Sequence, residues 1–196
     1  MDTARAMNGW YWRQMATWAG ILGRRELARE YWERLWALRP ADPSVMETLA
    51  HLHAVKGERP EAIALFERAL AIDASRPAGW FNLGFLRQES GAHEEALEAF
   101  DRALALDGKH DRAWYGRGLS LMKLGRIEEA VEAFRRNSAL QPMSPYGWYQ
   151  MVHALLRLDR RDEAEKAMRR LAGFEPKVVE QLQRETGIDI GVKLPF

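Results

Sequence analysis

The stretch Pro77–His110, which reads PAGWFNLGFLRQESGAHEEALEAFDRALALDGKH, decides the fold. Apolar residues recur in it at three- and four-residue spacings on both sides of Gly91, which predicts two amphipathic helices separated by a turn. Glycine suits that turn because it adopts the left-handed backbone conformation without the steric penalty of a Cβ atom. Ala96 allows the second helix to approach the first closely, and Phe100 projects from the same face one turn later. The stretch therefore predicts a helical hairpin.

The same pattern recurs along the chain without insertions. The small-residue column, with one member every 34 residues, comprises Ala28, Ala62, Ala96, Ala130 and Ala164. The large residues four positions later are Trp32, Phe66, Phe100, Phe134 and Met168. The turn column comprises Gly23, Gly57, Gly91, Gly125 and Asp159. The large residues early in each period are Trp12, Met46, Trp80, Trp114 and Trp148. Because these columns keep one register, they predict five consecutive hairpins.

Trp80, Leu83-Gly84, Ala96, Phe100 and Ala103 together resemble the pattern of the tetratricopeptide repeat family. The resemblance covers roughly residues 9–178 and implies an all-α, right-handed α-solenoid of helix-turn-helix repeats. We expect a single domain over residues 1–196, with repeats at 9–42, 43–76, 77–110, 111–144 and 145–178 and a cap and tail at 179–196.

In this family the first helix of each repeat lines a concave groove, which implies a set of candidate partner-binding residues. The set comprises His51, Phe81, Asn82, Phe85, Gln88, Tyr115, Leu119, Tyr149, Gln150 and His153. Aromatic side chains with polar tips, together with amides, suit a bound peptide because they bury its apolar groups and hydrogen-bond its backbone. Two alternatives to partner binding remain. Phe81, Phe85 and Leu119 would pack on neighbouring helices as core residues, and Asn82 would be solvated without holding a ligand.

The groove lacks the two-carboxylate clamp with which co-chaperones of the family hold the C-terminal carboxylates of heat-shock chaperones. That clamp requires Lys, Asn, Asn, Lys and Arg at set positions. Counted from the second repeat, those positions hold Glu47, His51, Asn82, Arg112 and Gly116. Counting from the first or the third repeat fails as well, so we expect a different kind of protein or peptide partner.

Composition narrows the function further. The net charge of +1 gives no electrostatic attraction to nucleic acid, and the absence of cysteine excludes disulfides and cysteine–zinc sites. No signal sequence or membrane-spanning run is evident, which favours a cytoplasmic location without membrane insertion. His51 and His53 lie two residues apart, a spacing that does not place both on one helix face. We expect no metal, no cofactor and no enzymatic activity, since no nucleophile, base and orienting residue form a set. The sequence thus favours an adaptor or assembly factor.

The first repeat is unusually aromatic. Its aromatic residues are Trp10, Tyr11, Trp12, Trp18, Tyr31, Trp32 and Trp36. Either these side chains pack against the second helix of their own repeat, or they form a contact surface. The second reading supports an alternative function, a structural self-assembly unit that forms homo-oligomers through the first repeat and the C-terminal tail.

The C-terminus departs from the repeat pattern. A short capping helix is expected from about Lys177 to Thr186, with Gly187 ending it. The residues that follow alternate in polarity, which indicates an extended segment with one apolar edge. The apolar members are Ile188, Ile190, Val192 and Leu194. This tail either covers the last helix pair, or lies in the groove of its own or a neighbouring chain, or is disordered.

Overall fold

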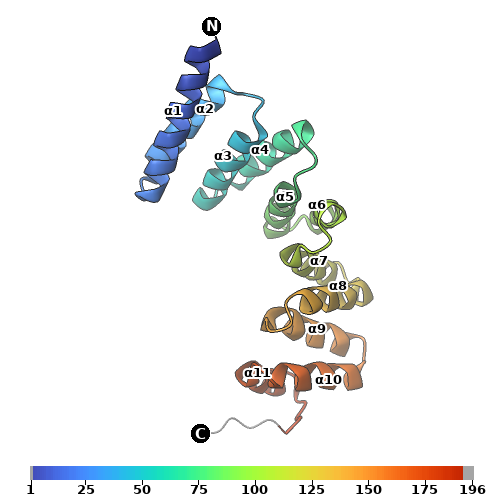
Figure 1. Cartoon of the computed structure of the whole chain (residues 1–196). Coiled ribbons are helices and arrows are strands. Elements are labelled where there is room, and N and C mark those ends of the chain that lie inside the picture. The colour runs from blue at the N-terminus through green and yellow to red at the C-terminus, as the bar shows by residue number, and fades with distance from the viewer. Residues whose placement is uncertain (1, 192–196) are drawn as a thin grey trace. The chain divides into compact units, whose positions relative to one another are not determined.

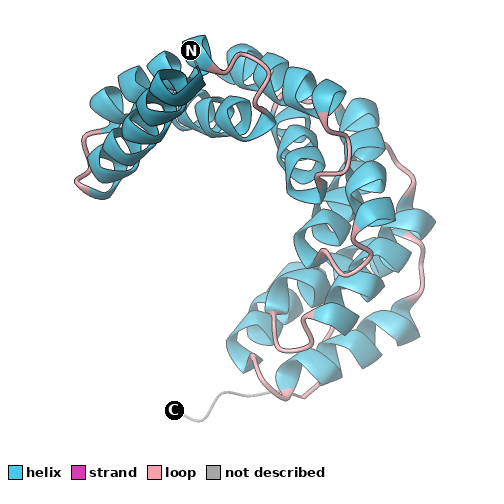
Figure 2. Ribbon diagram, turned by 45° about the horizontal axis from the view of Figure 1, so that its top comes forward, coloured by secondary structure: helices cyan, strands magenta, loops and turns pink. Residues whose placement is uncertain are grey.

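The computed structural model of the chain describes residues 2–191, and its side chains from residue 8 onward. All regular structure in that part of the chain is helical (Figures 1 and 2). The helices are α1 (Asp2–Ile21), α2 (Arg25–Leu38), α3 (Pro43–Lys56), α4 (Arg59–Ile72), α5 (Pro77–Glu89), α6 (His93–Leu106), α7 (Asp111–Lys123), α8 (Ile127–Leu140), α9 (Pro145–Arg157), α10 (Arg161–Ala172) and α11 (Pro176–Thr186). The prediction of an all-helical hairpin array with a C-terminal capping helix is confirmed.

The chain forms two compact units, Met1–Ser90 and Gly91–Phe196. In the first unit α1 packs on α2, α2 on α3, α3 on α4, and α4 on α5. In the second unit the same succession runs from α6 to α11, and α11 also contacts α9. Within each unit the helices contact their neighbours along the chain, as expected of repeats that stack on one another. The single-domain organisation of residues 1–196 stays a prediction.

The turn column behaves as the sequence predicts. The turn glycines have positive φ angles: Gly23 70°, Gly57 86°, Gly91 81° and Gly125 76°. Asp159 takes the same conformation, with a φ of 57°, and it is the one non-glycine residue with a positive φ in the described chain. Aspartate tolerates this region at a modest cost, so the fifth hairpin keeps the geometry of the other four.

The small-residue column lies inside the core. Ala62, Ala96, Ala130 and Ala164 are fully buried, and the exposed fraction of Ala28 is 2%. The aromatic rings of the next column are inserted into the space that small residues leave. A Cβ atom built on Gly116 would lie 2.5 Å from the ring of Phe100, and one on Gly118 would lie 2.5 Å from the ring of Phe134. The rings of Phe100 and Phe134 therefore fit only because the facing positions on α7 are glycines.

The early tryptophans also hold the turns between repeats, a role that the sequence did not predict. The indole N–H of Trp80 donates to the carbonyl of Ala74 at 2.9 Å, and that of Trp114 donates to the carbonyl of Gly108 at 3.0 Å. Trp148 donates to the carbonyl of Pro142 at 3.2 Å in the same way. Each indole thus satisfies a backbone carbonyl six residues earlier, in the turn that precedes its repeat.

The first helix is longer than expected. Our repeat boundary placed its start near Gly9, whereas α1 begins at Asp2. The preceding residues carry no apolar periodicity, but alanine, arginine and methionine among them are strong helix formers. Intrinsic propensity therefore extends the helix beyond the part that the repeat pattern specifies.

Gly118→Ala and Gly20→Ala should have opposite effects, although the chemical change is the same. At Gly118 the new methyl group collides with Phe134, so we expect the free energy of unfolding to fall by about 1–3 kcal/mol. At Gly20, also within a helix, nothing lies within 4 Å, so the better helix propensity of alanine should stabilise the chain by up to about 1 kcal/mol. Urea unfolding followed by circular dichroism measures both effects. Equal effects at the two positions would contradict the packing described here.

Candidate functional site

The predicted groove residues of the first unit lie on α3 and α5. The side-chain amide of Asn82 lies 3.3 Å from Nε2 of His51, across the interface between the second and third repeats. The rings of Phe81 and Phe85 stack with their centroids 6.5 Å apart. The exposed fraction of Phe85 is 47%, whereas Phe81, Asn82 and Gln88 are half-buried. Asn82 is therefore bonded within the chain, and Phe85 presents the largest apolar surface of this group.

The His51 ring is held against the core of the second repeat. It meets the ring of Phe66 edge-on at 5.3 Å. Desolvation lowers the pKa of His51 below its usual value. The neutral ring that this favours can accept a hydrogen bond from Asn82. The polar part of this surface therefore carries no positive charge from His51 near neutral pH.

In the second unit, an aromatic pocket of about 320 Å³ opens between α7, α9 and α11. Its lining comprises Tyr115, Pro145, Tyr146, Tyr149, Gln150, Val178 and Gln181. Three of these residues, Tyr115, Tyr149 and Gln150, belong to the set predicted from the sequence. None of the lining residues is charged, so the pocket offers aromatic faces, hydroxyl groups and amides.

The tyrosines differ in their exposure. Tyr146 has an exposed fraction of 67%, whereas Tyr115 is half-buried, and their rings meet edge-on at 6.4 Å. Burial raises the pKa of Tyr115, while a hydrogen bond with Gln150 acts in the opposite direction. Tyr115 therefore stays protonated near neutral pH and keeps a hydroxyl that can donate. The pocket combines a fixed tyrosine at its base with an exposed one at its rim.

Helix α11 engages the other end of this site. Tyr149 donates its hydroxyl hydrogen to Oε2 of Glu185 at 2.7 Å, and the amide of Gln181 donates to Oε1 at 2.7 Å. Hydrogen bonds from Gln181 and Tyr149 lower the pKa of Glu185, and the bond to Glu185 raises that of Tyr149. Nε2 of His153 lies 3.3 Å from the same carboxylate but does not have the geometry of a hydrogen bond.

These contacts change the sequence-based picture of the groove. Tyr149 and His153 face the chain's own Glu185, and Leu119 is half-buried and packed against the hydrophobic core of the unit. Sequence reasoning pointed Tyr146 into the groove as well, but it missed the α11 residues Val178 and Gln181 as pocket residues. The signal was available, because Leu182 falls in the column of the early tryptophans and so makes α11 equivalent to a further first helix. A first helix in that position should line the same face as α7 and α9.

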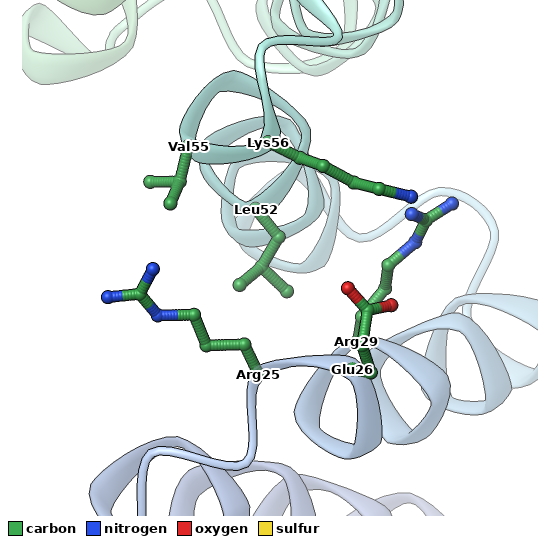
Figure 3. Close-up of a pocket in the computed structure, with 6 residues that line it drawn as sticks. All are labelled: Arg25, Glu26, Arg29, Leu52, Val55 and Lys56. Carbon is green, nitrogen blue, oxygen red and sulfur yellow. The ribbon is translucent and has the colours of Figure 1, made fainter.

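A smaller pocket of about 140 Å³ lies between α2 and α3 in the first unit. Figure 3 shows basic side chains from both helices around Leu52. Their charges are largely compensated within the chain. Arg29 pairs with Glu33 at 2.8 Å and with Glu58 at 3.5 Å, and Lys56 lies 2.9 Å from Glu58. This pocket reflects incomplete packing between the first two repeats and gives no sign of an anion site.

Other kinds of site find little support in the described chain. The residues that the structure describes include no cluster of three or more His, Asp or Glu side chains able to hold a metal ion. None of the described helices combines the length and the apolar character required to cross a bilayer.

Comparison with known proteins identifies the repeats. The sequence profiles of the tetratricopeptide repeat match residues 21–77, 81–142 and 145–178. The chain belongs to the tetratricopeptide repeat family. No curated protein matches it.

Several solved structures share the fold. A crystal structure of MamA is 17% identical, with a TM-score of 0.81, and the match covers 97% of this chain and 100% of that one. YrrB, described as "a TPR protein with an unusual peptide-binding site", is 18% identical, with a TM-score of 0.76 and coverage of 86% and 88%. A Pseudomonas aeruginosa pilF structure is 17% identical, with a TM-score of 0.73 and coverage of 96% of both chains. At these identities the likeness shows the fold alone.

Proposed function

We propose that the chain is a protein-interaction module, an adaptor or assembly factor, that binds an extended peptide segment of a partner protein in the aromatic pocket of its second unit. The observation that carries the proposal is the pocket itself, with three tyrosines and two glutamines around about 320 Å³ and no charged residue in its lining. Ligand pockets of this kind combine apolar walls with a few polar groups that fix orientation.

The chemistry of the lining indicates the class of peptide. Tyrosine faces bury apolar side chains at low entropic cost, and proline-rich segments dock in aromatic-lined grooves of this type. The amides of Gln150 and Gln181 and the hydroxyl of Tyr115 offer hydrogen bonds to a peptide backbone. An uncharged extended segment carrying proline or another compact apolar residue fits best. The pocket does not offer the cationic groups required by an acidic C-terminal tail or a nucleic acid.

The first unit supplies a second candidate surface. Phe85 is exposed and stacked on Phe81, and Asn82 and His51 lie beside each other. This surface has an apolar face next to hydrogen-bonding groups, but no pocket comparable to that of the second unit. We therefore rank this surface second to the pocket as a binding site, and we test it with a separate variant. The peptide-binding site named for YrrB supports the general proposal by analogy.

Peptide selection tests this function. A phage library of random dodecapeptides is selected on the immobilised chain, and the binding of a synthetic hit is measured by fluorescence anisotropy. Tyr146→Ala removes an exposed ring from the pocket rim, so we expect binding about 10- to 30-fold weaker, the size of a typical aromatic hot spot. Met143→Ala is the matched control, since its exposed fraction is 66% and it does not line the pocket, and it should change affinity less than about twofold.

The other outcomes are equally informative. Loss of binding in Phe85→Ala, with Tyr146→Ala unaffected, would move the site to the first unit. Hits rich in aspartate and glutamate would contradict the uncharged pocket as the recognition element. Failure to select any peptide from a chain that is folded by circular dichroism would contradict peptide capture as its function.

A further inference from the structure

Glu185 of α11 lies beside the peptide pocket and is bonded to two of its lining residues. Its Oε2 atom accepts the hydroxyl hydrogen of Tyr149 at 2.7 Å, and its Oε1 atom accepts a hydrogen from the side-chain amide of Gln181 at 2.7 Å. Tyr149 and Gln181 line the pocket, whereas Glu185 does not. Glu185 can therefore act on a bound peptide through these two side chains.

The charge state of Glu185 decides the direction of both hydrogen bonds. Hydrogen bonds from Gln181 and Tyr149 lower the pKa of Glu185, so its carboxyl group is ionised near neutral pH. An ionised carboxylate has no hydrogen to donate and accepts every hydrogen bond that it makes. Tyr149 and Gln181 must therefore donate to Glu185, and neither bond can reverse.

These bonds determine what the two lining residues can offer a ligand. A phenol carries one hydroxyl hydrogen, and Tyr149 gives it to Glu185, so only the lone pairs of its oxygen remain. The bond to Glu185 raises the pKa of Tyr149 and a hydrogen bond from Gln181 lowers it, which places the amide of Gln181 beside the phenol oxygen as well. The carbonyl oxygen of Gln181 is then the group left for a ligand. We call these two oxygens, of Tyr149 and Gln181, the acceptor pair.

The α7 side of the pocket has the reverse polarity. Burial raises the pKa of Tyr115 and a hydrogen bond from Gln150 lowers it, so Gln150 donates to the oxygen of Tyr115. Tyr115 keeps its own hydroxyl hydrogen for a ligand. The pocket thus presents a donor from α7 and acceptors from α9 and α11. A peptide placed between them cannot exchange its N–H and C=O groups without losing both kinds of bond.

On the basis of the peptide-binding function proposed above, we propose that Glu185 is a positioning residue. It holds Tyr149 and Gln181 as hydrogen-bond acceptors, so the pocket selects a peptide segment that presents a backbone N–H to the acceptor pair. Binding removes water from both oxygens, and a buried acceptor without a partner costs free energy. Proline has no N–H, so it is disfavoured at this position and fits instead against the tyrosine rings at the rim.

Amide-to-ester replacement in the ligand tests which N–H groups are used, because it removes the hydrogen without adding bulk. In a synthetic peptide selected on the native chain, each backbone amide is replaced in turn and binding is measured by fluorescence anisotropy. At one position we expect binding about 10-fold weaker, the effect of leaving a buried acceptor unpaired. Selected peptides aligned at that position should contain no proline there. Frequent proline at the ester-sensitive position would overturn the proposal without any variant of the chain.

Glu185→Gln tests the positioning role in a side chain of nearly the same shape. The new amide can donate to Tyr149 or to Gln181, so one member of the acceptor pair is free to turn its own hydrogen towards the pocket. The cost of the ester at the sensitive position should therefore fall below about threefold, measured as the ratio of parent to ester affinity in the same variant. Simple loosening of α11 would weaken both peptides and leave this ratio unchanged.

Glu180→Gln is the matched control. It makes the same change on the same helix but outside the pocket lining, and it should leave the ratio at its native value. An ester scan without a sensitive position, or a ratio that Glu185→Gln leaves unchanged, would overturn the role of Glu185. The pocket itself would still stand in either case, because its assignment depends on weaker binding to the Tyr146→Ala variant.

Discussion

Phe134→Ala should lower the free energy of unfolding by about 3–5 kcal/mol, the usual cost of removing a fully buried phenylalanine. The side chain on α8 has no exposed surface and belongs to the hydrophobic core of the second unit. Its ring fills the space beside Gly118, where a Cβ atom would lie 2.5 Å away, and it meets Tyr115 at 5.9 Å. Alanine would leave a cavity between α7 and α8 that these neighbours cannot close without moving the backbone.

The effect should be concentrated in the second unit. Repeat arrays unfold in parts, so hydrogen exchange of the α7 to α9 amides measures the loss locally, and urea unfolding gives the global value. Phe174→Ala is the control, because Phe174 is only partly buried and should cost clearly less. A loss below about 1 kcal/mol in Phe134→Ala would contradict the aromatic column as the filling of the inter-helix space.

The columns of glycine, alanine and aromatic residues explain why the repeat fold could be predicted from one sequence. A hairpin repeated every 34 residues places each glycine, alanine and aromatic residue in an identical environment, so every repeat confirms the others. The register was strong enough to predict that Asp159 would take a left-handed conformation, and its φ is 57°. Pro43, Pro77 and Pro145 stand in the same register and open α3, α5 and α9, at a helix position where the missing N–H of proline is harmless.

The candidate site was less predictable because it depends on contacts between elements rather than on the period. The sequence places Tyr149 and His153 on the groove side of a helix, but it does not reveal that Glu185 of α11 faces both of them. In the same way, Phe81 and Phe85 lie one turn apart, and only the packing decides that Phe85 is the more exposed ring. Periodicity therefore pointed to α7 and α9 as helices of the candidate site, while the part played by α11 and the identity of the accessible residues required the structure.

Ile188→Ala should be the second large change, with a loss of about 2–5 kcal/mol, although the residue lies beyond the last helix. Its exposed fraction is 3%, and it joins the hydrophobic core together with Val179 and Leu182 of α11. Gly187, with a φ of 70°, ends α11 and directs the chain back towards that core. Of the three alternatives for the tail, Ile188 and Ile190 follow the first, because both pack against the last helices. Val192 and Leu194 lie outside the described residues.

Polar contacts fix the same turn. The amide of Gln183 donates to Oδ1 of Asp189 at 2.9 Å, and the backbone N–H of Gly191 donates to the same oxygen at 2.7 Å. Because these bonds lie on the solvent side, they orient the segment, whereas Ile188 supplies its buried apolar contact. Ile190→Ala is the matched control, since Ile190 is only partly buried and should cost less than half as much.

Losing the buried contact of Ile188 should also disturb the peptide pocket. Val178 and Gln181 of α11 line the pocket, so loosening α11 removes one wall as well as the bond from Tyr149 of α9 to Glu185. In Ile188→Ala we therefore expect faster hydrogen exchange of the α11 amides together with weaker binding of a selected peptide. If α11 exchanges faster while peptide affinity is unchanged, the ligand does not contact that wall and must bind mainly through α7 and α9. If α11 keeps its native protection, Ile188 is not what holds the capping helix in place.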